Sequence, residues 1–219
     1  DEANEFLDAF FTALNYYSIK ASMEFAKEKG QAFYRFEDSE YANGNFFESY
    51  YLKELVVTSE KAKSALGNVP IITIEMWKEL EKDVKQYGMY NAYRLAVAPT
   101  GSISYIRSSS ASMSAITEKV EVRDYADSRT IYPMPFLTND NMHLYEEAYD
   151  IDQYKIIDSY AVAQKHVDQA ISMTLYIKDT WNTEELAKLY IYAWLKGIKS
   201  VYYVRQRMQT IDECVACSV

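Results

Sequence analysis

The stretch SMTLYIKDTWNTEELAKLYIYAWLKGIKSVYYV, residues 172–204, decides the fold class of this chain. Residues 172–177 predict one short strand, and residues 198–204, rich in β-branched and aromatic side chains, predict a second. A helix over about 183–195 lies between them and is closed by Gly197. Because a dozen or more residues separate two short hydrophobic strands, the pattern favours a parallel strand–helix–strand unit over a hairpin. The sequence therefore predicts an α/β fold.

Composition limits what this protein does. The 219 residues include 32 acidic and 23 basic side chains, for a formal charge of −9. A protein with this charge is not expected to bind the phosphate backbone of nucleic acids. The longest apolar runs span only a few residues, far fewer than the roughly 20 that a membrane helix needs. The N-terminal residues are acidic where an export signal is basic, so we expect a cytoplasmic protein.

Helical periodicity dominates the first 93 residues. Residues 1–29 predict one long helix, because large apolar side chains recur every three or four positions, and Gly30 follows as a C-cap. A turn at Asn43 and Gly44 precedes a short predicted helix over about 46–57. Thr73 is the expected N-cap of another helix over about 74–87, with Gly88 just beyond it.

The middle of the chain mixes short strands, loops and helices. Residues 94–98 predict a buried strand that Pro99 ends, and residues 127–135 are expected to be extended or looped. Two helices follow in the prediction, the first capped by Asn139 and Asp140 and running through Tyr149. The second spans about 153–169, and after Val204 the pattern predicts only a polar tail.

The first candidate site is PTGSIS, residues 99–104, directly after a predicted strand. Backbone amides at a helix start, together with hydroxyl groups and a glycine, form an anion site that suits phosphate. Arg94 and Arg107 lie nearby in the sequence. An ordinary capped turn is the competing interpretation, because capping by Ser and Thr is routine.

The second candidate is the pair Cys214 and Cys217, the only cysteines in the sequence. Thiols at this spacing close a ring reversibly, and thiol exchange requires an accessible thiolate, which a terminal tail supplies. A zinc site would need two more ligands, with only His143 and His166 remaining for that role. An inert exposed pair of thiols is the third interpretation.

The third candidate is Tyr202–Tyr203 in the second predicted strand. Successive residues of a regular strand point to opposite faces, which would separate the two rings. Two phenols in contact could instead pass a radical, and the pattern alone does not choose. His166 ends a predicted helix near Asp168, where the helix dipole favours a protonated imidazole with a structural rather than catalytic role.

Several motifs, taken together, resemble the C-terminal part of the large, catalytic subunit of class I ribonucleotide reductase, and most closely class Ib. The match covers about residues 94–219, in order and in approximate spacing. The matching segments are LAVAPTGSISYI (95–106), YPMP (132–135) before LTND (137–140), HVDQAISMTLY (166–176), YAWLKGIKSVYY (192–203) and the terminal Cys214 and Cys217.

The resemblance implies part of a ten-stranded α/β barrel whose enzyme reduces ribonucleoside diphosphates by radical chemistry. It implies that Tyr202 and Tyr203 relay the radical, and that Cys214 and Cys217 form a tail dithiol which reduces the active-site disulfide after each turnover. The resemblance further implies a group of residues that bind the substrate diphosphate: Pro99, Thr100, Gly101, Ser102 and Ile103.

The same resemblance implies partners and missing parts. No metal or cofactor is expected on this chain, and the metal–tyrosyl radical cofactor, with Fe or Mn, belongs to a separate small subunit. A glutaredoxin- or thioredoxin-like protein would reduce the tail. The active-site cysteines belong to an earlier part of the large subunit, and no cysteine precedes Cys214 here. We therefore expect a chain that is inactive without that N-terminal part, whether the gene is split or the polypeptide cleaved.

The expected organisation has three parts. Residues 1–93 form a helical segment on the barrel, residues 94–204 supply barrel strands, helices and the phosphate loop, and residues 205–219 form a flexible redox tail. The alternative from another class is a noncatalytic α/β binding module with a redox-sensitive tail.

Overall fold

The computed structural model describes residues 2–51, 57–125 and 127–207. Contacts divide the chain into two compact units. Unit 1 comprises Asp1–Val97 and Ser159–Ile171, and unit 2 comprises Ala98–Asp158 and Ser172–Val219. The division into three parts at residues 93 and 204 stays a prediction. Among the described residues, no helix combines the length and apolar character needed to cross a membrane.

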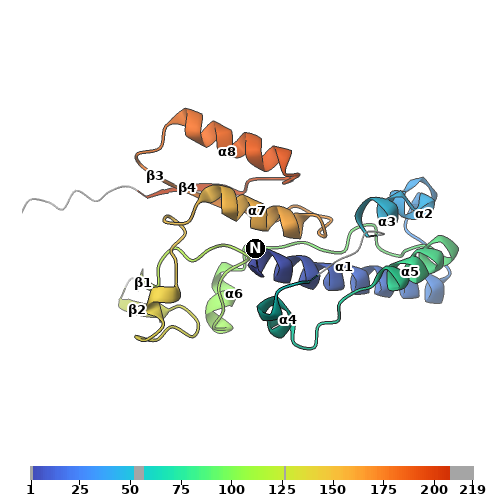
Figure 1. Ribbon diagram of the computed structural model, residues 1–219, viewed down its shortest axis with the longest axis horizontal. Helices are drawn as coiled ribbons and strands as arrows, with labels where there is room; N and C mark the ends of the chain where they lie inside the picture. The colour runs from blue at the N-terminus through green and yellow to red at the C-terminus, as the bar shows by residue number, and fades with distance from the viewer. Residues whose placement is uncertain (1, 52–56, 126, 208–219) are drawn as a thin grey trace, which may run out of the picture. The chain divides into compact units, whose positions relative to one another are not determined.

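Unit 1 is helical, and its long helix α1 packs against α4 and α5 (Figure 1). The Thr73 hydroxyl accepts the Met76 N–H at 3.3 Å, as expected of an N-cap, and Gly30 and Gly88 have φ angles of 62° and 76°. Both long helices therefore have the predicted bounds in the described chain. The elements are α1 (Glu2–Lys29), η1 (Phe36–Asp38), α2 (Glu40–Asn43), α3 (Asn45–Tyr50), α4 (Glu60–Leu66) and α5 (Ile74–Tyr87).

The helix predicted over 46–57 is shorter than expected. It begins after Gly44, whose φ of 87° lies in the left-handed region and separates this helix from the preceding one, and it ends at Tyr50. Tyr51 then leaves the helix and stacks its ring on Trp77, with centroids 3.8 Å apart. Residues 52–56 lie outside the described chain.

The core of unit 1 forms on one face of α1. Tyr16, Ile19 and Met23 are buried there against side chains from α3 and α5. The apolar stripe that predicted the helix lies on another face and is largely exposed within the described chain; its exposed members are Phe10, Leu14, Tyr17 and Phe25. Helix α1 therefore carries more apolar surface than unit 1 itself covers.

Unit 2 holds the described strands. Strands β3 and β4 pair in parallel with α8 between them in sequence (Figure 1), which confirms the predicted strand–helix–strand unit. Strands β1 and β2 form an antiparallel hairpin. The elements are α6 (Gly101–Ile106), β1 (Val120–Tyr125), β2 (Ser128–Pro133), η2 (Met142–Leu144), β3 (Thr174–Lys178), α8 (Thr183–Leu195) and β4 (Tyr203–Arg207), while α7 (Gln153–Gln164) begins in unit 2 and continues into unit 1.

Two strand predictions need correction. Strand β4 starts five residues later than predicted and includes Arg205 and Arg207, which the sequence pattern assigned to the tail. Its register is fixed by β3, which pairs Thr174 with Tyr203 and Lys178 with Arg207. The strand predicted over 94–98 is reduced to a single parallel bridge between Val97 and Ile171.

Two helix predictions also need correction. No helix runs from Asn139 to Tyr149, where only the short η2 forms. The Asn141 side chain accepts the Thr138 N–H at 2.7 Å and donates to the Phe136 carbonyl at 2.8 Å, so it stabilises a loop instead. Helix α7 ends at Gln164 rather than near 169, because the amides that follow Lys165, those of His166 and Val167, donate to carbonyls only three residues back.

Candidate functional site

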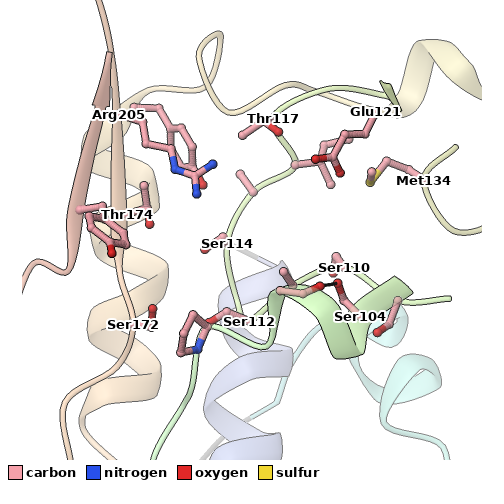
Figure 2. A pocket seen from close by; sticks show the side chains of 18 of the residues that line it. Ser104, Ser110, Ser112, Ser114, Thr117, Glu121, Met134, Ser172, Thr174 and Arg205 are labelled. Carbon is pink, nitrogen blue, oxygen red and sulfur yellow. Dashed lines mark hydrogen bonds between the residues drawn. The ribbon is translucent and has the colours of Figure 1, made fainter. Parts of the chain in front are cut away.

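A pocket in unit 2 brings together the tyrosine pair and residues 99–114, a serine-rich segment that begins with the predicted anion site. The cavity has a volume of about 210 Å³ (Figure 2). Its walls come from the loop around α6, from the β1–β2 hairpin and from the β3–β4 pair. Tyr202 and Tyr203 line it together with Pro99 and Gly101. Two of the sequence-predicted sites therefore share one cavity, although more than 90 residues separate them in the chain.

The serine-rich wall is held in an unusual backbone conformation. Thr100, Ser108 and Ser112 have positive φ angles of 40°, 48° and 54°, which side-chain-bearing residues adopt rarely. The Thr100 hydroxyl accepts the Ser112 N–H at 2.9 Å and makes no hydrogen bond that caps α6. Strained backbone of this kind concentrates at ligand-binding segments. The Thr100 side chain therefore does not cap α6, and the anion site predicted for this segment stays a prediction.

The five residues implied to bind diphosphate take different positions. Pro99 and Gly101 line the cavity, and Thr100 braces the loop through Ser112. Ser102 and Ile103 are exposed on α6 and do not line the cavity, so their contact with a ligand stays a prediction.

The two arginines that the sequence placed near this loop do not serve the cavity. Arg94 belongs to unit 1, where its side chain is buried against Asp168. Arg107 is exposed and is not part of the cavity wall. Proximity in sequence was misleading, because Arg94 pairs with Asp168 within unit 1, and Arg107 is the exposed C-cap residue of α6.

Sequence reasoning missed the charged wall of the cavity. Glu121 binds Arg123, with Oε1 and Nη2 2.8 Å apart, and its Oε2 accepts the Tyr105 hydroxyl at 2.6 Å. The Arg123 guanidinium also lies over the Tyr105 ring, 4.4 Å from its centroid. The alternation Val-Glu-Val-Arg from Val120 is the signal that could have found this wall, since alternate strand residues share a face.

Tyr202 and Tyr203 are in contact. Their ring centroids lie 4.1 Å apart, with the ring planes at 56°, and each side chain is about half exposed. A hydrogen bond with Tyr203 raises the pKa of Tyr202 above its usual value. The expectation that a regular strand would separate the rings does not apply, because β4 begins only at Tyr203, and both amides donate to the Met173 carbonyl.

His166 lies in a buried polar cluster of unit 1. Its Nε2 lies 2.5 Å from the Asp8 carboxylate and 3.5 Å from the Thr12 hydroxyl, and its Nδ1 lies 2.9 Å from the Tyr51 hydroxyl. Tyr51 also accepts a hydrogen bond from Asn15. These contacts join His166 to α1 and to the end of α3, which supports the structural role expected from sequence.

Burial sets the charge of this histidine. Burial lowers the pKa of His166 and outweighs the hydrogen bond to Asp8, so the environment favours the neutral imidazole rather than the protonated form that the helix dipole would favour. Burial acts to raise the pKa of Asp8, but hydrogen bonding to His166 and the charge of Lys165 leave it below its usual value. Asp168, which the sequence placed beside His166, instead binds Arg94.

A pH dependence of stability follows. Unfolded histidine takes up a proton near pH 6.5. His166 in the folded protein takes it up only at lower pH, so acidification through that interval stabilises the unfolded state. Protonation of Asp8 adds to the loss at still lower pH. We expect the urea midpoint to fall between pH 7.5 and 5.5, and His166→Gln to remove most of that dependence.

The exposed His143 provides the matched control. His143→Gln should retain the pH dependence of the parent chain. A midpoint that rises on acidification, or one equally pH-dependent in His166→Gln, would contradict the assignment to His166.

Cys214 and Cys217 both lie outside the described residues, so the tail dithiol stays a prediction. Within residues 2–51, 57–125 and 127–207, no group of three or more His, Cys, Asp or Glu side chains is arranged to hold a metal ion.

Comparison with known proteins gives the family. Residues 1–204 match the family model described as ribonucleotide reductase, barrel domain. The chain is 45% identical over 218 residues to a ribonucleoside-diphosphate reductase subunit alpha of Bacillus subtilis, covering 100% of the chain and 31% of the relative. A second subunit alpha of that organism, named NrdEB, is 44% identical over 219 residues, covering 100% of the chain and 20% of the relative.

A relative from another organism matches the chain at lower identity. The ribonucleoside-diphosphate reductase subunit alpha of Mycoplasma pneumoniae is 40% identical over 219 residues, covering 97% of the chain and 30% of the relative. The chain thus spans less than a third of the length of each of these relatives. Because the family model matches more than nine-tenths of the sequence, the chain belongs to the ribonucleotide reductase barrel-domain family.

Proposed function

We propose that the chain is the C-terminal part of a class Ib-like ribonucleoside-diphosphate reductase large subunit. In the overall reaction the ribose 2′ C–O bond breaks, a C–H bond replaces it and the oxygen leaves as water. A dithiol supplies the two electrons and two protons as it becomes a disulfide. The observation that carries the proposal is the convergence of the phosphate-type loop and the contacting tyrosines on one cavity.

The loop's role is to hold the substrate diphosphate. Hydroxyl groups and backbone amides suit phosphate oxygens, and Gly101 leaves open space where a Cβ would stand. Pro99 and Gly101 at the cavity wall would take the closest positions, and Thr100 keeps the loop in shape. Ser102 and Ile103 would contribute backbone amides.

The tyrosine pair's role is radical transfer. Each phenol gives up one electron and one proton and takes both back from its neighbour, so no net chemistry remains on the protein. Ring contact at 4.1 Å and the hydrogen bond between the two side chains support such an exchange. Half exposure of both rings leaves one side open to a donor beyond this chain.

Other polypeptides would complete the enzyme. Large exposed apolar side chains on α1, such as Phe10 and Phe25, and on α8, such as Trp194 and Leu195, form surfaces that further protein would cover. We assign them to an assembly with the N-terminal part of the large subunit and a small subunit. The Fe or Mn tyrosyl radical cofactor belongs to that small subunit.

Reconstitution tests the proposal. The tagged chain is mixed with the cysteine-bearing N-terminal part of the subunit, the radical-bearing small subunit, cytidine diphosphate and dithiothreitol. We expect the two large-subunit parts to co-elute and deoxycytidine diphosphate to form only when the chain is present. Absence of both co-elution and product would favour a noncatalytic module.

Cys217→Ser tests the tail in that assembly. A single thiol cannot form the intramolecular disulfide, so it cannot deliver two electrons to the active site. We expect activity with thioredoxin or glutaredoxin to stop after about one turnover, while activity with dithiothreitol persists. Ser218→Ala is the matched tail control. Equal loss with both reductants would refute the shuttle role.

A further inference from the structure

Three charged side chains line the unit 2 cavity: Glu121, Arg123 and Arg205. The first two neutralise each other, because Glu121 Oε1 lies 2.8 Å from Nη2 and 3.0 Å from Nε of Arg123. The remaining charge is that of Arg205, so the lining of the cavity has a net positive charge. On net charge alone, the cavity therefore favours an anion, in a protein that is acidic overall.

Arg205 is held at the cavity by strand geometry. It lies two residues after Tyr203 on β4, hence on the same strand face, and is paired in register with Tyr176. Figure 2 shows its guanidinium directed into the hollow rather than along the strand. Within the described chain, its side chain forms no ion pair or hydrogen bond, whereas the side chain of Arg207 on the same strand pairs with Glu147 at 3.5 Å.

Polar groups surround Arg205, and one of them, the Ser112 hydroxyl, has no hydrogen-bond partner among the described residues. Burial raises the pKa of Tyr176, while a hydrogen bond with Ser114 and the positive charge of Arg205 act to lower it. The cation is thus close to Tyr176 and, through it, to the serine-rich wall. On that wall the Ser112 hydroxyl is buried with no hydrogen-bond partner among the described residues. A guanidinium and a spare hydroxyl both bind phosphate oxygens.

We propose that Arg205 is the specificity-determining cation of the cavity, which binds the diphosphate group of the nucleotide and discriminates against unphosphorylated nucleoside. The inference rests on the proposed function and deepens it. The cavity, at about 210 Å³, is smaller than pockets that enclose whole drug-sized ligands, which are roughly 300–1,000 Å³. Its size suits the phosphate end of the ligand. A planar guanidinium adds the bidentate geometry that hydroxyl groups lack.

The test measures binding to the full 219-residue chain by titration calorimetry, with cytidine diphosphate and cytidine as ligands. The parent chain should bind the diphosphate more tightly than the nucleoside. Arg205→Gln should weaken diphosphate binding at least about tenfold and reduce its salt dependence, with no change for cytidine. Arg205→Lys, which keeps the charge, should recover part of the loss.

Arg129→Gln is the matched control, since Arg129 is an exposed arginine of the same unit that pairs with Asp124 outside the cavity. It should bind both ligands as the parent does, and circular dichroism confirms the fold of each variant. If Arg205→Gln binds the diphosphate like the parent, Arg205 is not the discriminating charge and the proposed function stands. If the parent chain does not bind the diphosphate, the assignment of the cavity as the substrate site fails as well.

Discussion

Tyr203→Phe should lower turnover of the reconstituted enzyme at least about a thousandfold, equivalent to ~4 kcal/mol of activation free energy. Phenylalanine keeps the ring that contacts Tyr202 but has no hydroxyl proton to lose, so the exchange between the two side chains is interrupted. The side chain is half exposed, so the substitution leaves no buried cavity. The measurement is initial-rate formation of deoxyribonucleoside diphosphate, driven by the small subunit.

The control is Tyr34→Phe, because Tyr34 is 90% exposed, belongs to unit 1 and does not line the cavity. It should turn over like the parent, which excludes a general effect of removing a phenol. Diphosphate binding by Tyr203→Phe should remain close to that of the parent. Unchanged turnover in Tyr203→Phe would remove the relay assignment, whereas loss of turnover together with loss of binding would indicate a structural role.

Asp168→Ala should destabilise the protein by about 3–5 kcal/mol, the usual effect of removing one partner from a buried ion pair. The Asp168 carboxylate accepts from the Arg94 guanidinium at 3.0 Å and from the backbone amides of Arg94 and Leu95 at 2.8 and 3.0 Å. The Arg94 side chain is only 4% exposed. Alanine therefore leaves a cation and two amides with no acceptor from this residue, away from water.

Asp124→Ala supplies the comparison, since it removes a carboxylate from the exposed ion pair with Arg129. Both side chains of that pair are 67% exposed, so we expect a loss of about 1 kcal/mol or less. Urea unfolding followed by circular dichroism measures both variants. Similar midpoints for the two substitutions would show that the Arg94–Asp168 pair contributes no more than a surface pair.

Local signals predicted the regular elements well. Residues 74–87 and 183–195 have the predicted bounds, because capping groups and the glycines that follow them act within a few residues. The parallel pairing of β3 and β4 also followed from the length of the connection. The predicted helix after Asn139 failed, because the hydrogen bonds of the Asn141 side chain favour a loop.

Some functional residues could be identified from the sequence, and others only from the tertiary structure. Tyr202 and Tyr203 and the loop from Pro99 could be singled out from sequence, because each motif is contiguous. Arg205 and the Glu121–Arg123 pair could not, because they gain importance only where strand pairing brings them to the cavity. The role of Arg94 was misjudged for the converse reason, since its partner Asp168 is 74 positions away.

The sequence by itself determined the family, the α/β class and the contiguous motifs, because these depend on local periodicity and residue order. The tertiary structure decided which motifs share a cavity, the ring contact of the tyrosines and the direction in which the pKa of His166 shifts. Those properties depend on burial and on register between strands far apart in the chain, and a one-dimensional pattern contains neither distance nor dielectric environment.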